Sequence, residues 1–358
     1  MWAKSIISGE AKGTAEDLAR LLLRVASACF YGPLVRIRNR LYDRGRLKST
    51  RLRVPVICVG NITTGGTGKT PMVIWLCRYL QSQGRKVAIL SRGYKSRGET
   101  GNDEMEIIRQ AIPDVPIVME GDRVRGGRWA IERYQPDVIV LDDGFQHRRL
   151  ERDLDIVMID CSCPFGYEHI LPRGLLREPV EQLKRAGAVV LSHCDSITTD
   201  DLASLENRVR HLLEDDQKKP ITQSRHEPIG LFAADGSEVE LASLSGKKVA
   251  AFCGIGNPDS FVATLRQLAA EVTGQRFFDD HVRYDESIGE VLRDLQRECN
   301  ADWLVTTEKD WVKLNRLPGV RAMKQLHWLK VEMVITQGQK QLCEMLDEIW
   351  KKARGTRH

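Results

Sequence analysis

Residues 60–70 combine glycines, a lysine and threonines in a pattern that suits phosphate binding. They read Gly-Asn-Ile-Thr-Thr-Gly-Gly-Thr-Gly-Lys-Thr and follow the apolar stretch 54–59, so we expect a strand, a glycine-rich turn and a helix that opens at Pro71. The glycines let backbone N–H groups surround phosphate oxygens, and the helix directs the positive end of its dipole at them. Lys69 can then reach the β- and γ-phosphates, and the Thr70 hydroxyl can ligate Mg²⁺. The run therefore predicts a binding site for ATP or GTP.

The predicted phosphate loop departs from the usual motif at one position. Thr63 stands where the first glycine is usual, six residues before the lysine, and Gly65 and Gly66 supply the flexibility instead. An ordinary glycine-rich turn is the alternative interpretation. The residues that we expect to contact the nucleotide are Thr63, Thr64, Gly65, Gly66, Thr67, Gly68, Lys69 and Thr70.

Two adjacent carboxylates follow a second apolar stretch. Residues 136–141 predict a buried parallel strand, and Asp142 and Asp143 come directly after it. Enzymes with a phosphate loop hold Mg²⁺ through an aspartate at the carboxyl end of a neighbouring strand. Because successive strand residues point to opposite faces, both carboxylates can reach one metal only where the strand has ended, and Gly144 permits such a turn. The alternative is a pair of solvated aspartates in a turn.

The elements that must position these groups alternate along the chain. We expect strands at 54–59, 86–90, 138–141, 155–159 and 188–191, and helices near 71–83, 122–134 and 178–185. This alternation predicts an α/β fold with a P-loop NTPase-type parallel sheet flanked by helices, and ligands at the carboxyl ends of the strands.

A second, smaller α/β domain is expected after a boundary near residues 216–222. It contains predicted strands at 248–253 and 303–306, a helix at 260–270, and no second phosphate loop. The predicted parts are therefore an amino-terminal segment over 1–53, a nucleotide-binding domain over 54–218, and a C-terminal domain over 219–358 that closes the cleft.

Composition places the chain among ordinary globular proteins. Its 358 residues are 42% hydrophobic and 29% charged, which suits a chain of two domains. The net charge of +5 is modest and does not by itself indicate nucleic-acid binding. Nine cysteines at irregular spacing predict free thiols in a reducing compartment. The close pair Cys161 and Cys163 lacks the second pair that a structural zinc site needs.

The amino-terminal segment places an apolar helical stripe beside a basic cluster. Arg20 and Arg24 interrupt the apolar positions, so we expect neither a transmembrane helix nor a secretory signal. Such a segment suits a membrane surface with anionic headgroups, and a helix packed on its own domain is the alternative. The stripe comprises Leu18, Leu21, Leu22, Val25 and Cys29. The basic cluster comprises Arg36, Arg38, Arg40, Arg44, Arg46, Lys48, Arg51 and Arg53.

The chain resembles the tetraacyldisaccharide 4'-kinases, the lipid A 4'-kinases. The resemblance lies in five segments and extends from about Leu21 to the final helix. It implies transfer of the γ-phosphoryl group of ATP to the 4'-hydroxyl of a tetraacyldisaccharide 1-phosphate, which gives the lipid IVA precursor of lipopolysaccharide. It also implies ATP and Mg²⁺ as cofactors, and a peripheral enzyme on the cytoplasmic face of the bacterial inner membrane without a nucleic-acid or protein partner. The segments are 54–71, 90–94, 142–148, 171–179 and 307–310.

The resemblance also implies roles for individual residues. Asp103 takes the place of the catalytic base, with His281 as its partner and Glu104 as the alternative base. From the residues alone, Asp103 reads as the first acid of a helix and His281 as a surface histidine. The implied catalytic residues are Asp103, His281, Lys69, Asp142 and Asp143. The implied metal ligands are Thr70, Asp142, Asp143 and Glu178. The expected contacts to substrate or phosphate are Arg92, Arg123, Gln146, His147 and Arg177.

Two other classes of protein share some of these features. A ParA/MinD-like membrane-associated ATPase would also combine this loop with a basic amphipathic helix, but that class has a lysine immediately before the paired glycines, where this chain has Thr64. A nucleic-acid-binding P-loop protein would explain the arginines, but no aromatic residues are interleaved with them.

Overall fold

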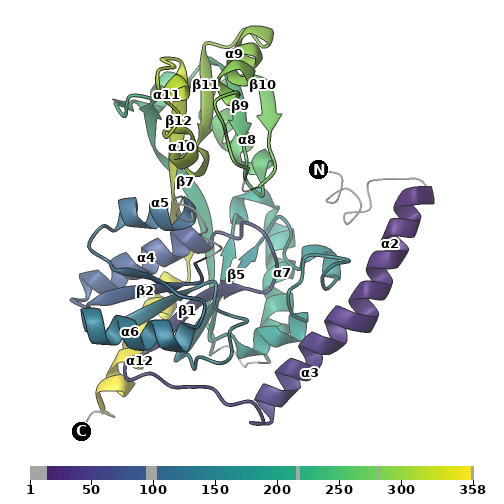
Figure 1. Cartoon of the computed structure of the whole chain (residues 1–358), viewed down its shortest axis with the longest axis vertical. Helices are drawn as coiled ribbons and strands as arrows, with labels where there is room; N and C mark the ends of the chain where they lie inside the picture. Colours follow the sequence, from purple (N-terminus) through teal and green to yellow (C-terminus); the bar gives the residue numbers. More distant parts are fainter. Residues whose placement is uncertain (1–13, 94–102, 215–217, 281, 356–358) are drawn as a thin grey trace. The chain divides into compact units, whose positions relative to one another are not determined.

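The structure is a computed structural model, which describes residues 14–93, 103–214, 218–280 and 282–355. Internal contacts divide the chain into two units (Figure 1). The first unit is Met1–Lys95, Ala111–Arg225 and Val334–His358, and the second is Ser96–Gln110 and His226–Met333. This division differs from the linear boundaries predicted above, because residues 96–110 belong to the second unit and the C-terminal residues return to the first.

The first unit is built on a parallel sheet with the strand order β7-β6-β5-β1-β4-β2-β3. Val59 of β1 pairs with Asp142 of β4, and Gly60 pairs with Val157 of β5. All neighbouring pairs in this set are parallel, so the carboxyl ends of the strands lie at one edge. The strands are β1 Val56–Asn61, β2 Val87–Ser91, β3 Ile117–Met119, β4 Val138–Asp142, β5 Leu154–Asp160, β6 Ala188–Ser192 and β7 Ile221–Ala233.

The predicted helices of the first unit are confirmed with one exception. The segment predicted as a helix over 178–185 is a 3₁₀ helix, η3, which begins after Pro179, a residue in extended conformation. The helices are α2 Thr14–Ala26, α3 Gly32–Asp43, α4 Lys69–Ser82, α6 Arg123–Tyr134, α7 Thr199–Leu212 and α12 Gln339–Gly355. The short turns are η2 Gly166–Glu168, η3 Val180–Arg185 and η4 Cys194–Ser196.

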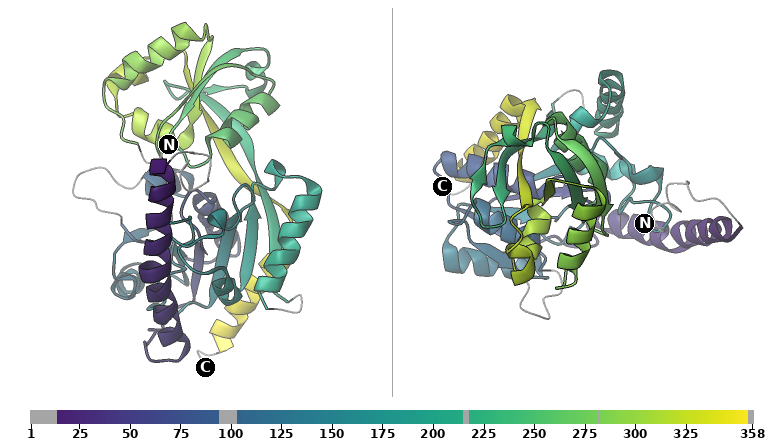
Figure 2. Two further views of the ribbon diagram at one scale, coloured as in Figure 1. Left: turned by 90° about the vertical axis from the view of Figure 1, so that its right-hand side faces the viewer. Right: turned by 90° about the horizontal axis from the view of Figure 1, so that it is seen from above.

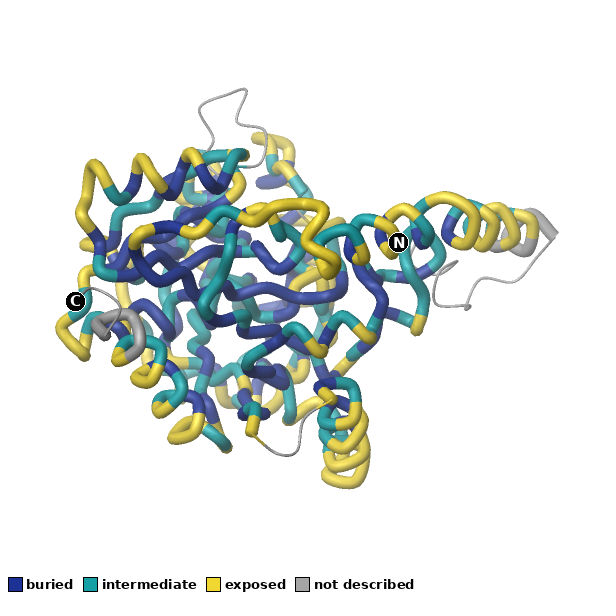
Figure 3. Tube along the Cα trace, turned by 90° about the horizontal axis from the view of Figure 1, so that it is seen from below, coloured by how far each residue is buried: buried dark blue, intermediate teal, exposed yellow. Residues whose placement is uncertain are grey.

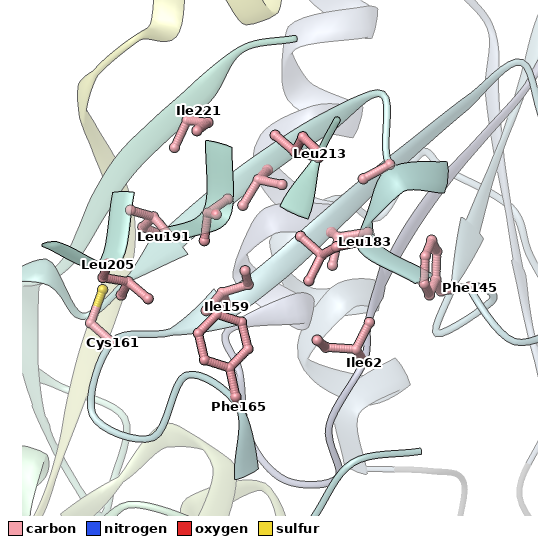
Figure 4. Packing of buried hydrophobic residues seen from close by; sticks show 14 of the residues in the cluster. Ile62, Phe145, Ile159, Cys161, Phe165, Leu183, Leu191, Leu205, Leu213 and Ile221 are labelled. Atoms are coloured by element: carbon pink, nitrogen blue, oxygen red, sulfur yellow. The ribbon is translucent and has the colours of Figure 1, made fainter. Parts of the chain in front are cut away.

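The core of the first unit lies on both faces of its sheet, as the apolar strands predict. On one face Ile62, Phe145 and Ile159 pack with Leu183 and Leu213 (Figure 4). The other face is covered by a separate buried cluster that comprises Leu52, Val54, Val56, Cys58, Leu90, Val118, Val124, Ala130, Ile139, Leu141 and Leu150. Figure 3 shows the buried strands in dark blue. All nine cysteines are free, which confirms the predicted thiols.

Within the amino-terminal segment, residues 14–43 form one continuous helix (Figure 2). A π-helical turn, η1, over Ser27–Tyr31 joins α2 to α3 without a break. None of the helices within the described residues combines the length and apolar character needed to cross a membrane.

The second unit has its own core. Its strand order is β10-β9-β11-β12-β7, and the short β8 pairs antiparallel with β7. Phe252, Leu292 and Leu304 are fully buried in its core. The remaining strands are β8 Glu238–Val239, β9 Lys248–Cys253, β10 Glu271–Phe277, β11 Trp303–Thr307 and β12 Leu326–Gln337. The helices are α5 Asp103–Ala111, η5 Leu241–Leu244, α8 Pro258–Gln267, α9 Ile288–Glu298, α10 Glu308–Leu314 and α11 Pro318–Arg321.

Candidate functional site

The loop between β1 and α4 has the backbone of a phosphate-binding loop. Gly65 and Gly68 have φ angles of 112° and 80°, in the region that favours glycine. Gly68 is the N-cap of α4, so Lys69 and Thr70 lie in the first turn of that helix. The first N–H groups of a helix have no partner within it, so they are available to an anion.

Three parts of the first unit hold this loop in place. Asn61 Nδ2 donates to Thr67 Oγ1 at 3.0 Å, and Ser192 Oγ of β6 donates to Thr67 O at 3.1 Å. On the other side, the Thr64 N–H donates to Leu175 O at 2.7 Å. The loop is therefore fixed by its own strand, by β6 and by the segment around Leu175. The pattern of residues did not identify Ser192, because its contact depends on which strand lies beside β5.

Asp142 and Asp143 lie in the turn that ends β4. Asp142 is 5% exposed, and its Oδ2 accepts a hydrogen bond from Ser91 Oγ at 3.0 Å. Asp143 has a φ of 49°, so the strand has ended before it, as we expected. Gly144 is needed for a different reason from the one predicted. A Cβ atom there would lie 2.3 Å from Cδ2 of the buried Leu141, so a larger residue would force that side chain to shift.

Two cations converge on the Asp143 carboxylate. Arg177 Nη1 donates to both Oδ1 and Oδ2 at 2.9 Å, and Lys69 Nζ lies 3.8 Å from Oδ1. Burial raises the pKa of Asp143, but Lys69 and Arg177 more than offset this effect and hold the pKa below its ordinary value. Asp143 is therefore an ionised carboxylate at the phosphate loop.

Gln146 and Arg123 also lie on this side of the first unit. Gln146 Nε2 donates to Asn61 O at 2.8 Å, which ties the turn after β4 to the end of β1. Arg123 is 2% exposed and its Nη1 donates to Glu120 O at 2.7 Å. Burial lowers the pKa of Arg123, and the Asp142 carboxylate acts in the opposite direction. An arginine remains charged in proteins, so Arg123 brings a buried positive charge toward Asp142.

His147 is neutral at physiological pH. Burial is the largest cause that lowers the pKa of His147, and the positive charges of Arg123 and Arg152 act in the same direction. Together they bring the pKa to about 4. Within the described residues, its Nε2 is buried and has no hydrogen-bond partner. A protonated imidazole would place a further cation beside the two arginines, so the neutral form is favoured.

We expect the free energy of unfolding to depend on His147 at mildly acidic pH. The unfolded chain binds a proton near the reference pKa of about 6.5, whereas the folded pKa is about 4. The folded state should therefore lose stability as pH falls through this window. Urea unfolding of wild type and His147→Gln at several pH values would measure this, and the variant should lose less stability. Parallel curves for the two proteins would contradict the shifted pKa.

Glu178 is bound by arginines in this structure. It is 1% exposed, and its carboxylate contacts Arg185 and, at 3.5 Å, Arg38 Nη2. Burial raises the pKa of Glu178 against the effect of these two arginines. The described residues contain no group of three or more His, Cys, Asp or Glu side chains arranged to hold a metal ion. The predicted place of Glu178 among metal ligands therefore stays a prediction. Arg92, which we expected at the phosphates, is exposed at the end of β2.

The residue predicted as the base lies in the second unit. Asp103 is the first residue of α5, as its sequence pattern suggested, and its Oδ2 lies 3.8 Å from Lys313 Nζ. Glu104 is the next residue of the same turn and is half-buried. His281 lies outside the described residues. The sequence pattern did not single out Lys313, although it lies three residues after Asp310 on α10.

Comparison with known proteins gives a consistent result. A family model described as tetraacyldisaccharide-1-P 4'-kinase matches residues 19–351. A tetraacyldisaccharide 4'-kinase of Syntrophus aciditrophicus (strain SB) is 41% identical over 318 residues, which cover 82% of this chain and 84% of that protein. A second tetraacyldisaccharide 4'-kinase, from Anaeromyxobacter sp. (strain K), is 38% identical over 359 residues. The match covers 94% of this chain and 93% of that protein.

A solved structure agrees with these relatives. It is a crystal structure of the "apo" form of LpxK from Aquifex aeolicus in complex with ATP. It superposes with a TM-score of 0.69 at 30% identity, and the match covers 93% of this chain and 99% of that chain. This chain therefore belongs to the tetraacyldisaccharide 4'-kinase family.

Proposed function

We propose that this chain transfers the γ-phosphoryl group of ATP to the 4'-hydroxyl of a tetraacyldisaccharide 1-phosphate. Membership of the family supports the reaction. One observation carries the proposal: Lys69, Arg177 and the ionised Asp143 converge at the phosphate loop. Phosphoryl transfer depends on positioning and on stabilising charge, and these groups are suited to both. The product would be lipid IVA, the precursor of lipopolysaccharide.

The residues of the phosphate loop hold the β- and γ-phosphates in this proposal. N–H groups at the start of α4 donate to phosphate oxygens, and Lys69 offsets the charge that develops as the γ-phosphoryl group is transferred. Arg123 and Arg177 offer guanidinium groups that can fork onto phosphate oxygens. The contacts of Thr67 with Asn61 and Ser192 keep the loop in its binding conformation.

Thr70, Asp142 and Asp143 form a donor set that fits Mg²⁺. The ion prefers oxygen ligands and uses one or two carboxylates together with substrate phosphates. Asp142 brings a nearly buried carboxylate to the end of β4, and Asp143 is ionised beside it. When bound, Mg²⁺ supplies neutralisation of negative charge on the phosphates.

Asp103 accepts the proton of the sugar hydroxyl in this proposal. A carboxylate that has one oxygen near Lys313 and is 23% exposed can still meet a substrate hydroxyl with its other oxygen. General bases of this kind contribute about 10²–10⁴-fold to rate. His281 is the proposed partner that orients Asp103 or shares the proton, and Glu104 is the alternative base.

An assay of the 358-residue chain with ATP, Mg²⁺ and tetraacyldisaccharide 1-phosphate in detergent micelles tests the reaction. The expected result is a lipid whose mass increases by one phosphoryl group, with one ADP released for each lipid. Parallel reactions contain no lipid, or DNA in its place. ATP hydrolysis without a phosphorylated lipid would instead support the ParA/MinD-like alternative, which the family match does not favour.

We further propose that the amino-terminal helix lies on the cytoplasmic face of the inner membrane. Its outer face exposes large apolar side chains, with Leu22 62%, Phe30 71% and Leu34 68% accessible. Its inner face is attached to the first unit, because Ser27 Oγ donates to Ile170 O at 2.9 Å and Tyr31 OH to Arg177 O at 3.1 Å. Packing of the helix on its own domain therefore explains the inner face only. The outer face, which is apolar and lies beside arginines, suits the surface of an anionic membrane.

Substitution of this exposed face should release the protein from membranes. We expect the triple variant Leu22→Ser, Phe30→Ser and Leu34→Ser to bind vesicles of anionic phospholipid more weakly, by about 10-fold or more, because each side chain loses burial worth about 1.5–3 kcal/mol. Co-sedimentation measures this, and wild-type binding should weaken as salt screens the arginines. Substitutions are preferable to removal of residues 1–35, which would also remove Ser27 and Tyr31.

Trp129→Ser is the matched control, since this side chain on α6 is also half exposed. It should leave vesicle binding unchanged. Equal sedimentation of the triple variant and wild type would mean that the helix is a structural part of the first unit only.

A further inference from the structure

The second unit contains a buried carboxylate that the mechanism above does not use. Asp310 of α10 is fully buried, and three groups donate to it: the Gly254 N–H at 3.0 Å, Thr307 Oγ1 at 2.8 Å and Tyr284 OH at 3.0 Å. Gly254 permits this approach, because a Cβ atom there would lie 3.2 Å from Asp310 Oδ1. A buried charge is costly unless it is paired and hydrogen-bonded. Asp310 is therefore held firmly in one orientation.

Lys313 lies between this carboxylate and Asp103. Its side chain is 8% exposed, and its Nζ is 3.6 Å from Asp310 Oδ1 and 3.8 Å from Asp103 Oδ2. Its Nζ forms no hydrogen bond with the described residues. A buried ammonium group without hydrogen bonds is stabilised by the charges around it. The two carboxylates therefore fix its position, and Asp310 is the more rigid of the two.

We propose that Lys313 is a positioning residue for Asp103. This rests on the proposed function, in which Asp103 is the base. Asp310 anchors Lys313, and Lys313 attracts one oxygen of Asp103, so the carboxylate keeps one orientation with its other oxygen available to the sugar hydroxyl. The distance of 3.8 Å between Lys313 Nζ and Asp103 Oδ2 is too long for a hydrogen bond, so Lys313 acts on this oxygen through its charge.

The steady-state kinetics of Lys313→Met should separate positioning from structure. Methionine keeps much of the side-chain length and removes the charge. We expect kcat to fall by about 10²-fold, the typical cost of misplacing a reacting group by about 1 Å. The KM for ATP should stay unchanged, because the loop and Lys69 belong to the first unit. Lys313→Arg, which keeps the charge, should recover part of the loss.

A double-mutant cycle with Asp103→Asn decides the matter. If Lys313 acts through Asp103, Lys313→Met should cost little in the Asp103→Asn background. Losses that multiply in the cycle, or a kcat for Lys313→Met within about 2-fold of wild type, would overturn the proposal. Full activity of Asp103→Asn itself would instead refute the base assignment in the proposed function.

Two controls keep this test conclusive. Lys247→Met removes another lysine of the second unit, one that lies over the Trp303 ring, and should leave kcat unchanged. Thermal unfolding shows whether Lys313→Met folds. If it does not, Lys313→Gln replaces it in the same cycle, and the same two outcomes support or overturn the proposal.

Discussion

Replacement of Lys69 by alanine is expected to lower kcat by about 10³-fold or more, because loss of a preorganised cation removes stabilisation of the charge on the transferring phosphoryl group. Lys69 begins α4, its side chain is 13% exposed, and its Nζ faces Asp143. The fold should be unaffected, since the loop is held by contacts of Thr64 and Thr67 that do not involve Lys69. Steady-state assays at saturating Mg²⁺-ATP measure the loss.

Arg78→Ala is the matched control for Lys69→Ala, because it removes an exposed cation from the same helix. It should retain wild-type activity. Asp142→Ala and Asp143→Ala should each impair the Mg²⁺-dependent activity strongly. Rates near that of wild type for Lys69→Ala and both aspartate variants would refute the proposed kinase site.

Replacement of Asp103 by asparagine is expected to lower kcat by about 10²–10⁴-fold, the contribution of a general base, and to leave the KM for ATP nearly unchanged. The side chain keeps its size, so α5 should remain folded. His281→Ala should also lower kcat. The double variant should lose less than the product of the two single losses, as expected for groups that act as a unit.

Glu104→Gln is the control for Asp103→Asn, since Glu104 is the next residue in the same turn of α5. It should retain activity if Asp103 is the base. The reverse result, with the large loss in Glu104→Gln, would assign the base to Glu104. Multiplicative losses for Asp103 and His281 would place His281 elsewhere in the mechanism, for example in substrate binding.

The sheet of the first unit and its phosphate loop were predictable because their signals are local. Each of the five predicted strands is a short apolar run, and each lies within two residues of its predicted position. The loop was identified from glycines and a lysine at fixed spacing, and the φ angles of Gly65 and Gly68 confirm the expected geometry. Such local patterns are sufficient to predict a strand or a turn, because each element depends on the backbone preferences and the burial of residues that follow one another in the chain.

The contacts that complete the site were not predictable because they join distant segments. Arg177 meets Asp143 across 34 positions, and Ser192 reaches Thr67 across 125. Neither pair leaves a spacing signal. The placement of Asp103 has the same origin, because contacts group residues 96–110 with the distant residues 226–333. Family resemblance supplied the residue types, but only the fold supplies their partners.

The π-helical turn at Ser27–Tyr31 sets the phase of the exposed apolar face. Along this helix the step from Val25 to Phe30 is five residues, which is the interval that a π-turn closes, while the other steps are three or four. A regular α-helix would rotate every later side chain by about 100° for that extra residue. The wider π-turn accommodates the extra residue, so the exposed apolar side chains of both halves of the helix can meet one planar surface. On the other face, Tyr31 is hydrogen-bonded to the segment that carries Arg177. The exposed positions in phase are Leu18, Leu22, Val25, Phe30, Leu34 and Ile37.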